Sequence, residues 1–310
     1  MTKLRTQAAK NGLLRRMRKQ RLNYIAILPS LITLLNGICG FAAMVFASKA
    51  ISESTNHFFH EKFQISYFAM AGYMILLAMI ADMLDGRIAR MSKNTSSFGG
   101  QLDSLCDMVS FGIAPAFLMI KILEYELGPG VVHTTLINFV ERFIWFAAVA
   151  YISCAAIRLA RFNVENEEDE SVHMSFIGLP TPAAAGVIVS LIIFQQQVLK
   201  AISQQLNNSY IILDKVIICT LPFILIGVAI LMVTRIRYPH VVNQYIRGKK
   251  PFAHFIRVLF LIGLIIWSIQ TALALLFCGF AASGFLKWFY YKVIKKKKDL
   301  TPISQQPAID

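Results

Sequence analysis

The stretch DMLDGRIARMSKNTSSFGGQLDSLCDM, residues 82–108, places four aspartates at positions 82, 85, 103 and 107 of a largely hydrophobic chain. The chain has 310 residues, of which 56% are hydrophobic and only 15% are charged. Apolar runs of the roughly 20 residues that a helix needs to cross a bilayer recur along the whole sequence. Because carboxylates are costly inside a membrane, four of them in one short stretch indicate a functional site.

Hydropathy predicts an all-α protein, a polytopic membrane bundle of about eight transmembrane helices. The predicted spans cover residues 24–49, 66–90, 98–123, 137–160, 179–200, 210–234, 253–269 and 271–291. Only Ser268, Gln270 and Thr271 mark a break between the last two spans, so seven spans are the alternative. We therefore expect a basic segment at 1–23, a transmembrane domain at 24–291 and a basic tail at 292–310.

Positive charge orients these spans. The first 23 residues contain eight Lys or Arg residues and no acidic residue, and Lys295 to Lys298 form a second basic cluster. Because Lys and Arg accumulate in short cytoplasmic loops, we expect both termini and the aspartate stretch to face the cytoplasm, in a bacterial inner (cytoplasmic) membrane. The net charge of +14 follows from this distribution and from attraction to anionic head groups. Membrane lipids, and not nucleic acid, are therefore the expected partners.

The four aspartates form two pairs, each on one helix face. Asp82 and Asp85 are three residues apart, and Asp103 and Asp107 are four apart. The polar, turn-prone segment MSKNTSS at 91–97 separates the pairs, so two antiparallel helices would bring them face to face. Carboxylates this close disfavour one another's ionised forms unless a counter-charge is present. An all-oxygen set suits Mg²⁺, Mn²⁺ or Ca²⁺, and we predict a divalent-metal site able to activate a phosphate group.

Small residues accompany the carboxylates. Gly86 and Ala89 lie one turn beyond the first pair, and Gly99 precedes Asp103 by one turn. They leave room for something larger than an ion to approach the backbone. Arg90 adds a cation that can hold a phosphate oxygen.

Together these residues resemble the signature of the CDP-alcohol phosphatidyltransferases. The pattern D-x2-D-G-x2-A-R-x8-G-x3-D-x3-D is met without departure by Asp82, Asp85, Gly86, Ala89, Arg90, Gly99, Asp103 and Asp107. The resemblance implies the fold of that family and a reaction in which a CDP-linked lipid loses CMP. In that reaction a hydroxyl of an acceptor alcohol attacks the phosphorus attached to the lipid.

The resemblance also implies residue roles. Asp82, Asp85, Asp103 and Asp107 would hold the metal, and Asp107 would take the proton of the acceptor as general base. Contacts to the CDP-lipid would come from the motif and from the first span, LPSLITLLNGICGF at 28–41, with residues Gly86, Ala89, Arg90, Gly99, Thr33 and Asn36. The domain 24–291 would then be catalytic, in a homodimer whose subunits each hold a site.

Two further stretches bear on the acceptor. RLARFN at 158–163 and FIGLPTPAAAGV at 176–187, taken with the first span, are similar to the membrane-integral phosphatidylserine synthases. That similarity implies transfer of a phosphatidyl group from CDP-diacylglycerol to L-serine. Arg158 and Arg161, with Asn163 nearby, are then candidates to bind the carboxylate of serine. The alternative is that the two arginines anchor the fourth span at the lipid head groups.

Three other interpretations stay open at this point. The same chemistry could use glycerol phosphate, inositol phosphate or choline as the acceptor. A cation transporter could coordinate its ion through the aspartate cluster, since intramembrane carboxylates also occur there. A catalytically inactive scaffold is the third. The clustering of the aspartates toward one membrane face, with small residues beside them, favours the enzyme.

Overall fold

The computed structural model of the chain describes residues 30–52, 65–92, 97–128, 135–168, 176–205, 209–234, 236–238, 263 and 268–290. Almost all of these residues are helical. Seven of the described helices are long and apolar enough to cross a membrane, namely Ser30–Ser52, Tyr67–Ile88, Phe98–Leu127, Phe139–Val164, Thr181–Ile202, Leu213–Val233 and Ile269–Leu286. This confirms the prediction of an all-α, multi-pass membrane protein.

These helices correspond to seven of the eight spans that hydropathy predicts. The remaining one, at 253–269, falls almost wholly outside the described residues, as do the basic segments 1–23 and 292–310. The eighth span and the roles of the two basic segments therefore stay predictions.

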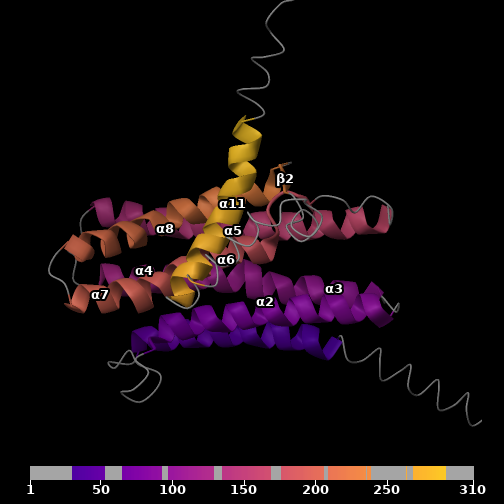
Figure 1. The fold of residues 1–310 in the computed structure, drawn as a ribbon, viewed down its shortest axis with the longest axis horizontal. Helices are drawn as coiled ribbons and strands as arrows, with labels where there is room; N and C mark the ends of the chain where they lie inside the picture. Colours follow the sequence, from indigo (N-terminus) through magenta and orange to yellow (C-terminus); the bar gives the residue numbers. More distant parts are fainter. Residues whose placement is uncertain are drawn as a thin grey trace, which may run out of the picture. The chain divides into compact units, whose positions relative to one another are not determined.

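The described residues up to Tyr125 form one compact unit. It contains the N-terminal helix Ser30–Ser52, α2 (Tyr67–Ser92), α3 (Ser97–Asp107), the π-helix η1 (Met108–Ile113) and the start of α4 (Ala114–Leu127). These helices lie alongside one another in Figure 1. Their buried faces are rich in alanine, with Ala43, Ala47 and Ala50 on the N-terminal helix and Ala71, Ala78 and Ala81 on α2. Small residues let helix backbones approach closely in a membrane.

The third span of this unit changes its winding at the end of the aspartate motif. α3, η1 and α4 form one continuous helix, and the π-helical stretch begins directly after Asp107. The buried residues of η1 are Ser110, Phe111 and Gly112. π-helical turns inside an α-helix are rare and are frequently found at functional sites.

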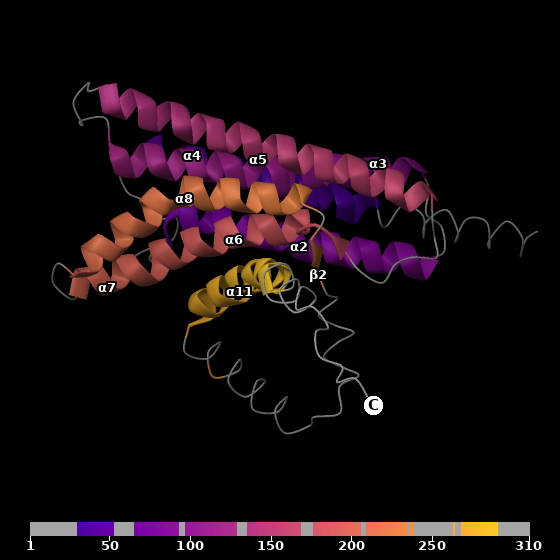
Figure 2. The same ribbon diagram turned by 90° about the horizontal axis from the view of Figure 1, so that it is seen from above.

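The described residues from Glu126 onward form the second compact unit. Its helices are α5 (Thr135–Glu168), α6 (Thr181–Phe194), the π-helix η2 (Gln195–Leu199), α7 (Lys200–Gln205), α8 (Ser209–Val233) and α11 (Ile269–Tyr290). α8 packs against both α5 and α6, and α11 packs against α6 (Figure 2). Gly186 permits the second contact, because a Cβ there would collide with the ring of Phe277 on α11.

Two very short strands connect helix ends in the second unit. β1 (Phe176–Ile177) pairs antiparallel with β2 (Arg237–Tyr238). Gly178 follows β1 with a φ of +83°, and its N–H donates to the carbonyl oxygen of Ile236 at 2.8 Å. Glycine adopts this left-handed conformation without the steric cost that other residues meet. The pairing ties the segment before α6 to the segment after α8.

Candidate active site

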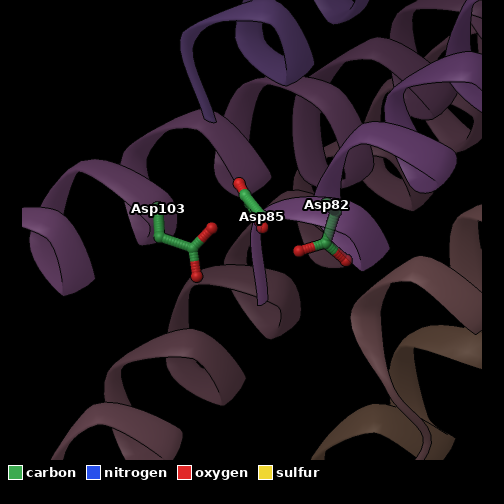
Figure 3. Close-up of side chains that lie close together, drawn as sticks. All are labelled: Asp82, Asp85 and Asp103. Atoms are coloured by element: carbon green, nitrogen blue, oxygen red, sulfur yellow. The ribbon is translucent and has the colours of Figure 1, made fainter. Parts of the chain in front are cut away.

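Three carboxylates meet between α2 and α3. Asp82 and Asp85 lie on α2 and Asp103 lies on α3, and each offers one carboxylate oxygen so that the three oxygens lie within 4.8 Å of one another. Figure 3 shows the three side chains directed toward a common space. The spacing in the sequence predicts that the two helices present their aspartates to each other, and the structure brings these three together.

The fourth aspartate makes a different contact. Asp107 is the last residue of α3, and its carboxylate interacts electrostatically with those of Asp82, Asp85 and Asp103. It also accepts a hydrogen bond from the amide of Asn36, whose Nδ2 lies 2.8 Å from Oδ1 of Asp107. Asp107 is therefore held from a helix other than the two that carry the aspartates.

The carboxylates are sheltered, and two of their oxygens lack a hydrogen-bond donor among the described residues. Asp85 is 4% exposed and Asp107 is 8% exposed, and Asp82 and Asp103 are half-buried. Oδ2 of Asp85 and Oδ1 of Asp103 are buried and accept no hydrogen bond from any residue that the structure describes. No described Lys or Arg forms an ion pair with any of the four. Sheltered carboxylates of this kind stay ionised only with a cationic partner.

This arrangement fits a hard divalent cation. The donors are all oxygen, three of them lie within 4.8 Å, and two of the carboxylates have a buried oxygen without a described hydrogen-bond donor. Mg²⁺, Mn²⁺ and Ca²⁺ prefer oxygen ligands of this type. The residues present therefore fit the metal that the aspartate motif predicts.

The N-terminal helix supplies polar side chains to two of the aspartates. Thr33 is 5% exposed and hydrogen-bonds the carboxylate of Asp85, and Asn36 is 0% exposed and donates to Asp107. The two residues are three positions apart and so share one face of the helix. From the sequence we expect Thr33 and Asn36 to contact the CDP-lipid; the structure shows that both contact aspartates of the motif.

Two glycines bring the N-terminal helix close to the third span. A Cβ on Gly37 would lie 3.0 Å from Sγ of Cys106, and a Cβ on Gly40 would lie 2.6 Å from Cα of Ser110. Cβ atoms do not approach a backbone atom as closely as the second distance, so only glycine fits at position 40 in this packing. The close approach places Asn36 within reach of Asp107.

The other predicted CDP-lipid contacts lie on the same two helices as the cluster. Gly86 and Gly99 are half-buried, on α2 and α3 respectively, and the backbone of Gly86 hydrogen-bonds the Asp85 carboxylate. Ala89 and Arg90 belong to α2, but their side chains lie outside the described part of the chain. Their predicted roles stay predictions.

The predicted serine-binding residues lie on α5, in the second unit. Arg158 is buried, and its Nη1 lies 3.4 Å from Oγ1 of Thr181 at the start of α6. Arg161 is half-buried and donates through Nη1 to the carbonyl oxygen of Val233, at 3.3 Å. Asn163 is half-buried on the same helix. Each arginine therefore contacts another helix of the second unit, Arg158 the start of α6 and Arg161 the C-terminal end of α8.

Sequence reasoning did not identify Ser110. Its hydroxyl donates to the backbone oxygen of Asn36 at 2.8 Å, and the residue is fully buried in η1. The sequence contains a weak signal for it, a small polar residue three positions after Asp107 inside an apolar run. Nothing in the local spacing indicates that its partner lies 74 positions earlier.

A family model for the CDP-alcohol phosphatidyltransferases matches residues 26–221 of the chain. Over 275 residues the chain is 28% identical to a protein of Helicobacter pylori named CDP-diacylglycerol--serine O-phosphatidyltransferase, which covers 88% of this chain and 95% of the relative. A protein of the same name from Methanocaldococcus jannaschii is 35% identical over 55% of this chain and 64% of the relative.

A third protein of that name, from Saccharomyces cerevisiae, is 33% identical over 52% of this chain and 51% of the relative. The family match covers more than half of the 310 residues and contains the whole aspartate motif. It also contains the N-terminal helix that contacts Asp85 and Asp107. The chain is an enzyme that belongs to the CDP-alcohol phosphatidyltransferase family.

Proposed function

We propose that this chain transfers the phosphatidyl group of CDP-diacylglycerol to the hydroxyl of L-serine, giving phosphatidylserine and CMP. The observation that carries the chemistry is the group of three carboxylate oxygens within 4.8 Å, beside a fourth aspartate held by Asn36. The choice of serine is supported by the relatives named CDP-diacylglycerol--serine O-phosphatidyltransferase, one of which matches 88% of the chain.

Asp82, Asp85 and Asp103 hold the divalent cations, Mg²⁺ or Mn²⁺, in this proposal, with Asp107 as a further ligand. When bound, the cations supply the positive charge that stabilises the diphosphate and the departing CMP. The buried oxygens of Asp85 and Asp103 without a described donor support this assignment. The same cluster would be a costly arrangement if its function were only structural.

Asp107 takes the proton of the acceptor hydroxyl. The serine oxygen forms a bond to the phosphorus attached to the lipid, the bond from that phosphorus to the CMP oxygen breaks, and the hydroxyl proton passes to the carboxylate. A positioned carboxylate that accepts a proton in this way typically contributes about 10²–10⁴-fold to the rate. Asp107 is suited to this task because Asn36 holds it in a sheltered position.

The nucleotide and diphosphate would lie along the small residues of α2 and α3. Gly86, Ala89 and Gly99 leave room beside the carboxylates, and Arg90 binds a phosphate oxygen. Thr33 and Asn36 act at this site through their contacts with Asp85 and Asp107.

Arg158, Arg161 and Asn163 are proposed to bind the serine carboxylate. In the structure both arginines donate a hydrogen bond within the second unit, Arg158 to Thr181 and Arg161 to Val233, so the two candidates are tested side by side. Arg158→Gln and Arg161→Gln should each raise the KM for serine by about 10-fold or more if that arginine binds the serine carboxylate, since a charge-assisted hydrogen bond is lost. An unchanged serine KM in both variants would contradict this assignment.

The charge distribution supports a topology for the proposed enzyme. Residues 24–291 form the transmembrane catalytic domain, and the basic segments 1–23 and 292–310 lie in the cytoplasm together with the aspartates, at a bacterial inner membrane. The active form is a homodimer in this proposal. Cysteine accessibility from either side of sealed vesicles checks the orientation, and cross-linking in membranes checks the dimer.

One experiment tests the reaction most directly. The full-length protein, purified in detergent, is incubated with CDP-diacylglycerol, Mn²⁺ or Mg²⁺, and a mixture of labelled L-serine, glycerol phosphate, inositol phosphate and choline. We expect phosphatidylserine and CMP, and no product when the metal is chelated. A different lipid product would change the acceptor. Absence of CMP release from a folded, metal-loaded preparation would contradict the enzymatic proposal and favour cation transport.

A further inference from the structure

We propose that Asn36 is a positioning residue for Asp107. Its amide holds one oxygen of the carboxylate, so that the other oxygen stays directed at the hydroxyl of the acceptor alcohol. The inference rests on the proposed function, in which Asp107 is the proton acceptor. It adds a residue on the N-terminal helix, outside the aspartate motif, to the groups on which the rate depends.

The contact itself is short and fully enclosed. Nδ2 of Asn36 lies 2.8 Å from Oδ1 of Asp107, with Asn36 0% exposed and Asp107 8% exposed. A carboxylate on a short side chain can rotate about its last bond, and a hydrogen bond in a buried setting limits that rotation. The amide is neutral and keeps its N–H whether Asp107 is ionised or protonated. Asn36 can therefore hold the carboxylate both before and after the proton transfer.

Asn36 is itself fixed from the span that carries Asp107. The hydroxyl of Ser110 donates to the backbone oxygen of Asn36 at 2.8 Å. Gly40 allows this contact, because a Cβ there would lie 2.6 Å from Cα of Ser110. Asp107 and Ser110 are three residues apart on one span, and Asn36 contacts both of them. The amide is thus held in register with the carboxylate that it orients.

The remaining atom of the Asn36 amide argues against a purely structural role. Oδ1 of Asn36 is buried and accepts no hydrogen bond from any residue in the described ranges. Buried amide side chains that only stabilise a fold normally form hydrogen bonds with both their nitrogen and their oxygen. Within the part of the chain that the structure describes, the side-chain hydrogen bond of Asn36 goes to the proposed proton acceptor.

The test compares Asn36→Leu with a matched control in the second unit. Leu has nearly the shape of Asn and removes the hydrogen bond. We expect kcat for phosphatidylserine formation, measured at saturating Mn²⁺, to fall by about 10²-fold, while the KM for CDP-diacylglycerol stays within about threefold. Gln196→Leu also removes a buried side-chain hydrogen bond, from Gln196 Nε2 to Gln195 Oε1, and should keep kcat within about threefold of the wild type.

A double-mutant comparison separates positioning from general stabilisation. If Asn36 acts through Asp107, Asn36→Leu should cost little further activity, about threefold or less, in an Asp107→Glu background, where the carboxylate no longer meets the amide at the same place. If Asn36 had only a structural role, the double variant would lose activity by the product of the two single-variant losses. Asn36→Asp, which keeps the side-chain shape but cannot donate when ionised, is the second variant. The Asn36→Asp variant should also have a lower kcat than the wild type. It is used in place of Asn36→Leu if the Leu variant does not fold.

Specific results would overturn the proposal. A kcat at saturating Mn²⁺ within about threefold of the wild type in the folded variant would do so, as would an increase in the KM for CDP-diacylglycerol as large as the fall in kcat. Failure of the proposed function is distinguishable, because it would appear in the wild type as absence of phosphatidylserine. In that case the acceptor that the wild type does use replaces serine, and the same comparison of kcat values decides the role of Asn36.

Discussion

Asp107 and the three clustered aspartates make different contacts, and substitution of Asp107 tests the role proposed for it. Asp107→Asn keeps the side-chain shape and removes the proton-accepting oxygen. We expect kcat, measured as CMP release, to fall by about 10²–10⁴-fold, the usual contribution of a positioned general base. Asp214→Asn on α8 is the control, because Asp214 is a half-buried aspartate that accepts a hydrogen bond from Gln195 and lies outside the proposed machinery. Near-normal turnover in Asp107→Asn would contradict the role of proton acceptor.

Substitution of Thr33 should change the affinity of the site for the metal and not the proton transfer to Asp107. Its side chain hydrogen-bonds Asp85, a proposed metal ligand, and residues that support metal ligands typically change metal affinity by about 10–100-fold when they are replaced. We therefore expect Thr33→Val to raise the Mn²⁺ concentration for half-activation by that factor, with kcat recovered at saturating metal. Thr220→Val, at an exposed threonine on α8, is the control. An unchanged Mn²⁺ titration would show that the hydroxyl does not support Asp85 in this way.

The contrast between these residues shows what the sequence could predict at the site. Fixed spacing along one helix places Asp82 and Asp85 on one face, and a turn-prone segment brings Asp103 opposite them, so the group of three is predictable from local rules. The bond from Asn36 to Asp107 joins residues 71 positions apart. No local pattern encodes such a pair, because it depends on how closely two separate spans pack.

At the scale of elements, the packing of the N-terminal helix against η1 depends on Gly40. Gly40→Ala would place a Cβ 2.6 Å from Cα of Ser110, so the two backbones must separate. Overpacking of this kind costs about 1–3 kcal/mol of stability. We expect a lower melting temperature in detergent and a reduced kcat, because the separation also draws Asn36 away from Asp107.

The control for this substitution is Gly227→Ala on α8. A Cβ at Gly227 meets nothing within 4 Å, and replacing an exposed helical glycine by alanine gains about 0.5–1 kcal/mol of helix propensity. Its melting temperature should stay equal to that of the wild type or rise. Equal melting temperatures for the Gly40→Ala variant and the wild type would contradict the close packing.

The spans themselves follow from hydropathy, and their finer structure does not. Apolar length predicts a helix at each of the seven described spans, because backbone polar groups must be satisfied internally in lipid. The same rule does not distinguish an α-turn from a π-turn, so η1 and η2 are absent from the prediction. The pairing of β1 with β2 also goes unpredicted, since strands of two residues carry no periodic signal.

At the scale of the whole molecule, the aspartates and the proposed acceptor-binding residues belong to different units. The described residues to Tyr125 contain the motif and the N-terminal helix, and α5, in the second unit, contains Arg158 and Arg161. The family match from 26 to 221 includes both. In the proposed function the motif binds the CDP group and the metal, which are the same whichever alcohol is the acceptor. Acceptor choice therefore could not be read from the motif and rests on residues elsewhere in the chain.

Metal binding should stabilise the whole fold, and this can be measured without any substrate. Ionised carboxylates whose oxygens lie within 4.8 Å repel one another, so a cation that binds only the folded protein lowers its free energy. At a concentration 100 times its Kd, one such ion adds about 2.7 kcal/mol to the free energy of unfolding. We expect Mn²⁺ or Mg²⁺ to raise the melting temperature of the protein in detergent, and EDTA to reverse the rise.

Substitution of one clustered aspartate connects this stabilisation to the site. Asp103→Asn removes a charge from the group of three, so the protein without metal should be at least as stable as the wild type, and the rise with Mn²⁺ should largely disappear. Asp214→Asn, outside the cluster, should keep the full rise, and Na⁺ at equal ionic strength should produce none. If Asp103→Asn kept the wild-type response to Mn²⁺, the stabilising ion would have to bind elsewhere in the molecule, and the proposed role of the cluster as the metal site would be lost.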